Sequence, residues 1–254
     1  MKKILICGAT GFIGKNITIA LAKNKNYEVH AVRFKRPAYK LSSNVKWHKA
    51  DLRNPLLVDK LMKGMDIVIQ AAATTSGSKD IVSKPYIHVT DNAVINSYMF
   101  RSAYNNNIKH FIFPSCTVMY PSSKNATKEK DFTGKIIDKY KGAGETKVYL
   151  EKIAKFYSML SDTKFTIIRH SNIYGPHDKY DLDKSHVFGA TITKVLTAKD
   201  TLEVWGNGKE IRDFLYADDL VDFIKAAIRK QKKQYEIYNC GSGEPVSVKI
   251  LCEN

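Results

Sequence analysis

Three glycines near the amino terminus are spaced as in a phosphate-binding turn. Gly8, Gly11 and Gly14 follow the apolar run at 4–7 and precede a helical pattern of apolar residues. Gly8 permits a tight turn, Gly11 lets the backbone approach a phosphate, and Gly14 lets the helix pack closely on the strand. The free N–H groups at the start of such a helix attract negative charge. The spacing predicts a site for a dinucleotide pyrophosphate, with an ordinary strand–helix turn as the alternative.

Basic residues follow the second expected strand, at 28–33. A dinucleotide-binding fold selects its ribose at the end of this strand, where an NAD-binding protein carries Asp or Glu for the 2′-hydroxyl. This chain has Arg33, followed by Lys35 and Arg36. Cations there suit the 2′-phosphate of NADP, which an acid would repel. We therefore predict NADP as the cofactor, with NAD or a basic surface loop as the alternatives.

Strand and helix patterns alternate along the part of the chain that positions these residues. Strands are expected at 4–7, 28–33, 45–49, 67–69, 111–113 and 165–169, and helices at 55–62, 91–105 and 146–160. This alternation predicts an α/β fold, a doubly wound parallel sheet of Rossmann type. After Asn172 the pattern changes to a polar loop at 176–185, a helix at 186–196, a short strand and turn at 204–208 and a helix from 218. We expect a dinucleotide-binding domain at 1–170 plus about 209–230, and a substrate-binding lobe at 171–208 and 231–254.

Composition excludes several other classes of protein. The 254 residues carry 41 basic and 25 acidic side chains, a net charge of +16, without an arginine-rich arm or the alternating aromatic and basic residues of RNA-binding proteins. A lysine-rich solvated surface is expected, and no nucleic-acid partner. The four cysteines have no CxxC spacing, which argues against a disulfide scaffold or a zinc site. Without a membrane-spanning run or a signal peptide, the protein is expected in the cytoplasm.

Several further motifs resemble one known family. They are 8–14, 50–52, 71–73, 146–147, 169–176 and 212–219. Together they resemble the extended short-chain dehydrogenase/reductase, or NAD-dependent epimerase/dehydratase, family of nucleotide-sugar enzymes. The segments 174–178, 184–187 and 204–206 are similar to its GDP-L-fucose synthase-like branch, whose members use NADPH to epimerise and reduce a 4-keto-6-deoxy sugar.

The glycine turn, the basic segment and the resemblance together imply a set of site residues. Those implied to bind the cofactor are Gly8, Thr10, Gly11, Phe12, Ile13, Gly14, Arg33, Arg36, Asp51, Leu52, Ala71, Ala72, Ala73, Lys147, His170 and Asn172. Those implied to bind the substrate are Thr117, Asn172, His186, Trp205 and Arg212. Asp51 and Leu52 would hold the adenine, Lys147 the nicotinamide ribose, and Arg212 the diphosphate. The resemblance also implies a nucleoside-diphosphate sugar as substrate and a homodimer through the helices at 91–105 and 146–160. Family members usually continue for several more elements, so the small lobe is expected to be incomplete, with a truncated or an unusually short chain as the alternatives.

The chain departs from the family pattern at two catalytic positions. The family places Tyr four residues before Lys, but Ala143 stands four residues before Lys147. Tyr140 is seven residues before Lys147, about 10 Å along a helix, and reaches the site only if the glycine-flanked segment unwinds. Cys116 stands where the family has Ser or Thr. A thiol is a weak hydrogen-bond donor, although Ser115 and Thr117 flank it.

The catalytic candidates are therefore Lys147, His186, Cys116 and Tyr140. His186 matches the family's acid/base in epimerisation, and the proton donor for reduction is Tyr140, Cys116 or a bound water. The sequence predicts an NADP-dependent nucleotide-sugar epimerase/reductase. The alternative is a catalytically impaired relative that binds cofactor or sugar nucleotide as a sensor or a partner subunit.

Overall fold

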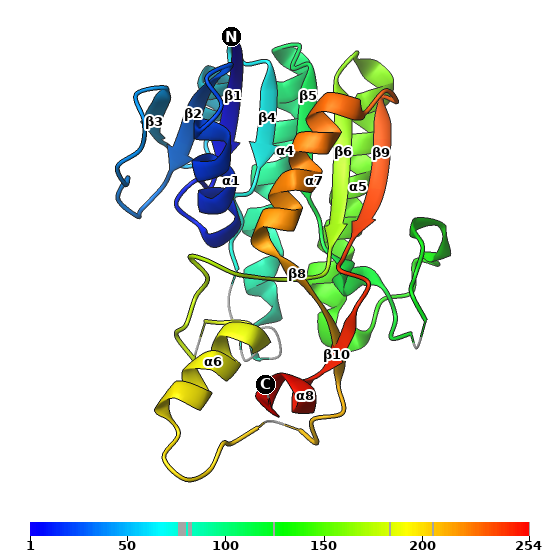
Figure 1. The fold of residues 1–254 in the computed structure, drawn as a ribbon. Helices are drawn as coiled ribbons and strands as arrows, with labels where there is room; N and C mark the ends of the chain where they lie inside the picture. Colours follow the sequence, from blue (N-terminus) through cyan, green and yellow to red (C-terminus); the bar gives the residue numbers. More distant parts are fainter. Residues whose placement is uncertain (76–79, 81–82, 124, 183, 205, 254) are drawn as a thin grey trace.

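A seven-stranded parallel sheet forms the centre of the computed structural model, which describes residues 1–253 except 76–79, 81–82, 124, 183 and 205 (Figure 1). Its strands, in spatial order, are β3 (Val45–Lys49), β2 (Tyr27–Arg33), β1 (Lys2–Cys7), β4 (Ile67–Gln70), β5 (His110–Pro114), β6 (Lys164–His170) and β9 (Tyr235–Cys240). Each neighbouring pair is parallel. The direction of winding reverses between β1 and β4, which is where such sheets bind ligands. The predicted doubly wound fold is confirmed.

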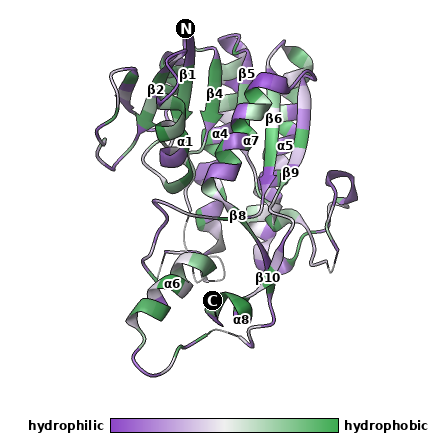
Figure 2. Cartoon of the chain, in the orientation of Figure 1, coloured by the Kyte–Doolittle hydropathy of each residue, from purple (hydrophilic) through white to green (hydrophobic). Residues whose placement is uncertain are grey.

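Helices cover both faces of this sheet. The helices α1 (Phe12–Ala22) and α7 (Ala217–Lys230) pack on one face, and α2 (Pro55–Met62), α4 (Thr90–Asn105) and α5 (Lys141–Leu160) pack on the other. The central strands are apolar on both sides, as parallel strands between helix layers must be. Phe100, Phe111, Phe113 and Phe165 fill the second face and are fully buried. Figure 2 shows the apolar strands enclosed by helices whose outer faces are polar.

A smaller lobe lies beyond the carboxyl ends of the main strands (Figure 1). It contains a second sheet of β10 (Pro245–Ser247), β8 (Ile211–Tyr216) and β7 (Asn172–Tyr174), together with α6 (Val187–Thr197) and α8 (Val248–Glu253). The division predicted from the sequence differs from the observed sheets in two places. β9, at 235–240, pairs with β6 in the main sheet, and β8, at 211–216, pairs with β7 and β10 in the second sheet. The short strand expected at 204–208 does not form in the described part of that segment, and Trp205 lies outside the described residues.

The helix that carries Lys147 begins earlier than predicted. It was expected to start at 146, but α5 starts at Lys141 and includes Gly142 and Gly144. A Cβ on Gly144 would lie 2.7 Å from Ile136 Cγ2, so the glycine lets the preceding loop pack against the helix. Four short 3₁₀ turns lie in the described chain between β4 and α5. They are η1 (Pro85–His88), η2 (Thr117–Met119), η3 (Glu129–Asp131) and η4 (Asp138–Tyr140).

The described residues show neither a metal-binding cluster nor a membrane span. No group of three His, Cys, Asp or Glu side chains among them is arranged to hold a metal ion. In the same residues, no helix combines the length and the apolar character needed to cross a membrane. All four cysteines are free thiols.

Candidate active site

The glycine turn between β1 and α1 has the close packing that its spacing predicts. Gly8 has φ +73°, and a Cβ on it would lie 2.7 Å from Ala72 Cα. A Cβ on Gly14 would lie 2.1 Å from Gly8 O, so the helix rests directly on the turn. Gly11 is the N-cap of α1, and no side chain of the described residues caps that end. The turn therefore presents the open helix start that attracts a phosphate.

The neighbouring cofactor candidates surround this turn. Thr10 lies within it, Phe12 and Ile13 open α1, and Ala71, Ala72 and Ala73 follow the end of β4. The Ala71 N–H donates to Cys7 O at 3.1 Å, which extends the pairing of β4 and β1 to the crevice.

The basic segment after β2 folds back over the glycine turn. Arg36 Nη1 donates to Thr10 O at 3.2 Å, and Arg33 Nη1 donates to Arg36 O at 3.4 Å. Tyr39 Oη donates to Ala9 O at 3.1 Å and holds the same segment down. The guanidinium group of Arg36 therefore lies next to the turn that would hold the pyrophosphate, and that of Arg33 lies against the backbone of Arg36.

Asp51, at the end of β3, is held by an arginine that the sequence analysis did not single out. Arg53 Nη2 donates to Asp51 Oδ2 at 2.7 Å, and Arg53 Nε donates to Asp51 Oδ1 at 3.0 Å. These hydrogen bonds lower the pKa of Asp51 below its usual value. Leu52 is 5% exposed and packs into the core behind it. A hydrogen-bond acceptor fixed here is what recognition of an adenine amino group requires.

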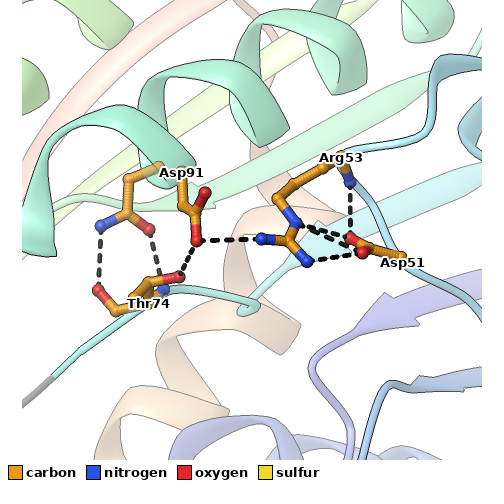
Figure 3. Close-up of polar contacts among 5 residues, drawn as sticks. Asp51, Arg53, Thr74 and Asp91 are labelled. Atoms are coloured by element: carbon orange, nitrogen blue, oxygen red, sulfur yellow. Dashed lines mark hydrogen bonds and ion pairs between the residues drawn. The ribbon is translucent and has the colours of Figure 1, made fainter.

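Arg53 also connects this strand end to the next two elements, as Figure 3 shows. Its Nη1 lies 3.5 Å from Asp91 Oδ2, and Thr74 Oγ1 donates to the same oxygen at 3.3 Å. The Thr74 N–H donates to Asn92 Oδ1 at 2.9 Å, and Asn92 Nδ2 donates back to Thr74 O at 3.0 Å. The ends of β3 and β4 and the start of α4 are thereby fixed to one another.

Lys147 and Cys116 meet at the carboxyl end of β5. Lys147 Nζ donates to Pro114 O at 3.0 Å and lies 4.6 Å from the centre of the Phe113 ring. Burial lowers the pKa of Lys147, and nearby Cys116 and Glu151 oppose that change. Burial raises the pKa of the Cys116 thiol, and the charge of Lys147 opposes it. The thiol is therefore a weak donor rather than a nucleophilic thiolate.

Ala143 and Tyr140 lie on the same helix as Lys147, at different distances. Ala143 is inside α5, one turn before Lys147 and on the same face. Tyr140 is the N-cap residue of α5, just before Lys141, and the helix between Tyr140 and Lys147 is continuous. The unwinding that would bring Tyr140 to the lysine is not seen.

Behind the site, a buried ion pair fixes the segments that carry Cys116 and Lys147. Glu151, one turn after Lys147, accepts from Arg169 Nη2 at 2.7 Å, and both side chains are 5% exposed. Ser115 Oγ donates to Glu151 Oε1 at 2.6 Å. Ser115 is 1% exposed, so it does not replace the missing hydroxyl on the substrate side. Sequence reasoning had left that role open.

His170 and Asn172 lie where β6 passes into the small lobe. Burial lowers the pKa of His170 to about 4, and its Nδ1 lies 2.8 Å from Ser171 O. Asn172 Nδ2 donates to Asp213 O at 3.1 Å. The Asp213 carboxylate accepts from Ser171 Oγ at 2.5 Å, and the backbone N–H of Gly243 donates to it at 2.8 Å. Asp213 thus joins β8 to the segments that follow β6 and β9.

His186 is the N-cap residue of α6 and faces the same region from the small lobe. It interacts electrostatically with His170 and with His88 of η1. Burial lowers the pKa of His186, the charge of Asp178 opposes that change, and Lys179 reinforces it. A histidine placed this way can exchange a proton with a bound substrate.

The other substrate candidates are placed less closely together. Thr117 opens η2 directly after Cys116 and is half-buried. Arg212 lies on β8, paired in register with Val246 of β10, and its Nη1 donates to Ile211 O at 3.4 Å. Trp205, as stated, is outside the described residues. Lys147, His170 and His186 are therefore the predicted residues that the structure brings together most clearly.

Sequence reasoning missed the residues that hold this site in place. They are Arg53, Glu151, Arg169, Asp178 and Asp213. Their side-chain partners are up to 49 residues away in the chain, so spacing gives no signal for most of these pairs. A basic residue two positions after Asp51 was the one local signal available.

Comparison with known proteins identifies the family to which this chain belongs. A family model described as the NAD dependent epimerase/dehydratase family matches residues 4–241. GDP-L-colitose synthase of Yersinia pseudotuberculosis is 29% identical over 97% of this chain and 78% of its own length. GDP-mannose 3,5-epimerase of Arabidopsis thaliana is 30% identical over 99% of this chain and 67% of its own length.

Solved structures show the same fold. UDP-glucose 4-epimerase of Thermotoga maritima, in complex with UDP-glucose, superimposes with a TM-score of 0.85 at 22% identity, over 99% of this chain and 80% of its own. UDP-glucuronic acid 4-epimerase of Bacillus cereus, in complex with UDP-glucuronic acid and NAD, gives 0.83 at 26% identity, over 97% and 80%. Because the family match extends from β1 to the end of β9, the chain belongs to the NAD-dependent epimerase/dehydratase family.

Proposed function

We propose that this protein is a nucleotide-sugar epimerase/reductase that binds NADP and acts on a 4-keto-6-deoxy nucleoside-diphosphate sugar. The grouping of Lys147, His170 and His186 beside the carboxyl edge of the main sheet supports this most directly. They come from α5, β6 and the start of α6, and His186 is the histidine among them that can exchange a proton near neutral pH. The GDP-sugar relatives favour GDP as the nucleotide.

NADP is the proposed cofactor because Arg36 lies beside the glycine turn and Arg33 lies against the backbone of Arg36. A charge-assisted hydrogen bond to a 2′-phosphate contributes about 1.5–3 kcal/mol, roughly ten- to a hundredfold in affinity. Calorimetric titration of Arg36→Ala is therefore expected to show that loss for NADPH and little change for NADH. Lys40→Ala, an exposed cation nearby, serves as the matched control. Tighter binding of NADH than NADPH by the unaltered protein would contradict the assignment.

The two proposed reactions use different parts of the site. In epimerisation, His186 exchanges a proton at a carbon next to the sugar ketone, a step that needs no hydride. In reduction, NADPH, when bound, supplies a hydride to the ketone carbon. Lys147 orients the cofactor ribose, and a proton must reach the ketone oxygen. Position 143 carries no hydroxyl and Tyr140 stays two turns from Lys147, so Cys116 or a bound water is left to donate it.

The test combines two measurements with GDP- and dTDP-linked 4-keto-6-deoxy sugars. Incubation in D₂O followed by mass spectrometry counts exchanged sugar hydrogens, and absorbance at the nicotinamide band follows NADPH oxidation. We expect deuterium incorporation that His186→Gln reduces by about 10²–10⁴-fold, the usual contribution of one acid/base group. If none of these sugars gives either deuterium incorporation or NADPH oxidation, the proposed enzyme is excluded.

A second candidate function has one structural observation in its favour. Because α5 is a continuous helix from Lys141, Ala143 holds the tyrosine position and Tyr140 stays two turns from Lys147. A protein that binds cofactor and sugar nucleotide without turnover, as a sensor or partner subunit, fits that arrangement. It predicts that both ligands bind in calorimetry while neither the deuterium nor the NADPH assay gives a signal.

A further inference from the structure

A buried carboxylate oxygen near His186 has no partner. Asp178 Oδ2 is buried and accepts no hydrogen bond within the part of the chain that the structure describes. The other oxygen, Oδ1, accepts from the backbone N–H of Lys179 at 2.7 Å. A buried polar atom without a hydrogen bond costs about 1–3 kcal/mol, and more when it carries charge. Such an atom is tolerated where it serves another group.

The backbone around Asp178 is fixed. The Asp178 N–H donates to Gly175 O at 3.3 Å, and Asn16 Nδ2 of α1 donates to Pro176 O at 2.8 Å. Gly175 has φ +135° and His177 has φ +70°, both on the left-handed side, so the turn that carries the aspartate is sharply bent. The turn that carries Asp178 is therefore tied to α1 of the main domain.

The same segment packs on the first turns of α6, whose N-cap is His186. A Cβ on Gly189 would lie 2.4 Å from Lys179 O, so the backbone next to Asp178 touches the helix one turn from His186. Thr193 Oγ1 donates to Tyr180 O at 2.7 Å and fastens the next residue of the segment to α6. These two contacts hold the residues that follow Asp178 against α6, and Asp178 is close enough to His186 to interact with it electrostatically.

The charges around His186 come from three further elements. Asp178 and Lys179 lie on the packed segment, His88 on η1 and His170 on β6. Burial and Lys179 favour the neutral ring, and the Asp178 carboxylate favours the protonated ring. Burial also raises the pKa of Asp178, and the charge of His186 opposes that rise. The two groups therefore stabilise each other's charged forms.

We propose that Asp178 is the positioning residue of His186, stabilising the protonated ring that forms when His186 takes a proton from the sugar. The idea rests on the proposed function, in which His186 exchanges protons at a carbon next to the ketone. In that step the neutral ring of His186 takes a proton from the carbon next to the ketone, so a C–H bond breaks, an N–H bond forms and the ketone becomes an enolate. The imidazolium, stabilised by the negative charge of Asp178, exchanges its proton with solvent and returns one to the enolate carbon, which restores the ketone and the neutral ring.

Titration of His186 by NMR tests this without turnover. The protein carries seven histidines, and with ¹³C-labelled histidine the His186 signal is assigned by its loss in His186→Gln. Asp178→Asn keeps the volume and removes the charge, and we expect it to lower the titration midpoint of His186 by about one pH unit. Asp181→Asn, an exposed carboxylate of the same segment, should leave the midpoint within a few tenths of a unit.

An unchanged midpoint in Asp178→Asn would overturn the inference, whether or not the protein converts any sugar. If the midpoint moves and no sugar is converted, the pairing stands and the proposed function fails. Should Asp178→Asn not fold, the reverse measurement applies: His186→Gln is expected to raise the pKa of Asp178, followed through its ¹³C carboxyl signal, and an unchanged value would refute the pairing. In an active enzyme, the acidic limb of the pH profile for deuterium incorporation shifts with the midpoint.

Discussion

Replacing Ala143 with tyrosine tests whether the surroundings of Lys147 lack only a phenol for reduction. Ala143 is half-buried in α5, four residues before Lys147, so the two side chains share a face about 6 Å apart along the helix axis. Lys147 Nζ is held by Pro114 O, at 3.0 Å, at the end of β5. A phenol introduced at 143 would lie beside that ammonium, which lowers the pKa of a neighbouring phenol.

The expected gain follows from the value of a positioned proton donor. General acid catalysis contributes about 10²–10⁴-fold, which corresponds to roughly 3–5 kcal/mol of activation free energy. Adding a ring at a half-buried helix position costs at most about 1–3 kcal/mol of folding free energy. We therefore expect Ala143→Tyr to increase the rate of NADPH oxidation at least about a hundredfold and to leave deuterium incorporation through His186 unchanged.

The matched control is Ala143→Phe, which adds the same ring without the hydroxyl. Rates are measured as single turnovers by the loss of NADPH fluorescence, so that product release does not hide the chemical step. Thermal unfolding confirms that both variants fold. Equal rates for the Tyr and Phe variants would refute the reasoning, because the proton would then come from elsewhere, with Cys116 and Tyr140 the next residues to replace.

Three further predictions concern stability. Gly8→Ala is expected to cost about 1–3 kcal/mol more than Gly64→Ala, because both glycines have φ near +74° but only the first would place its Cβ 2.7 Å from backbone atoms; equal losses in chemical unfolding would contradict this. Arg169→Met should cost about 3–5 kcal/mol by leaving a buried carboxylate unpaired, whereas Lys225→Met, in an exposed pair, should cost under about 1 kcal/mol. His110 is buried and its folded-state pKa is lowered to about 4, so the unfolded chain binds the extra proton and stability falls as the pH drops from about 6.5 towards 4. His110→Gln should reduce that slope over this window, and an unchanged slope measured by chemical unfolding would refute the assignment.

The main sheet was readable from the sequence because its central strands are buried on both sides. The run at 67–69 is apolar throughout, and β4 (Ile67–Gln70) is fully buried. The role assigned to Gly14 was also confirmed, since a Cβ there would collide with Gly8 O. In both cases a short stretch of sequence carries the whole constraint.

Two boundaries could not be read in this way. β9 (Tyr235–Cys240) forms the edge of the sheet and stays half-buried along most of its length, so its sequence lacks the apolar run of a central strand. The first turn of α5 contains Gly142 and Gly144, which have low helix propensity. In the structure, Ile136 packs against Gly144 in this first turn, where a side chain on Gly144 would collide with it. This is a tertiary contact, which local helix propensity does not predict.

The residues that position the site could not be predicted from the sequence either, because their roles depend on tertiary contacts. Arg53 lies two residues from Asp51, but its second partner, Asp91, is 38 residues further on. Asp178 lies near His186 because its segment packs on α6, and that packing requires Gly189 to have no side chain. The sequence identifies residues able to do chemistry, whereas their charge states are set by neighbours distant in the chain.

The two halves of the proposed chemistry stand on different parts of the molecule. His186 and Asp178 belong to the small lobe, while Lys147 and Cys116 belong to the main domain, where the pair of Glu151 and Arg169 fixes their segments. A buried ion pair of this kind contributes little stability over apolar residues of the same size, so we attribute its value to placing the lysine and the thiol. Two positions of that arrangement carry no hydroxyl: Ala143 stands where a tyrosine was expected, and Cys116 where a serine or threonine was expected. Under the proposed function, proton exchange at the sugar depends on His186 and Asp178, whereas reduction needs a proton donor that position 143 does not supply.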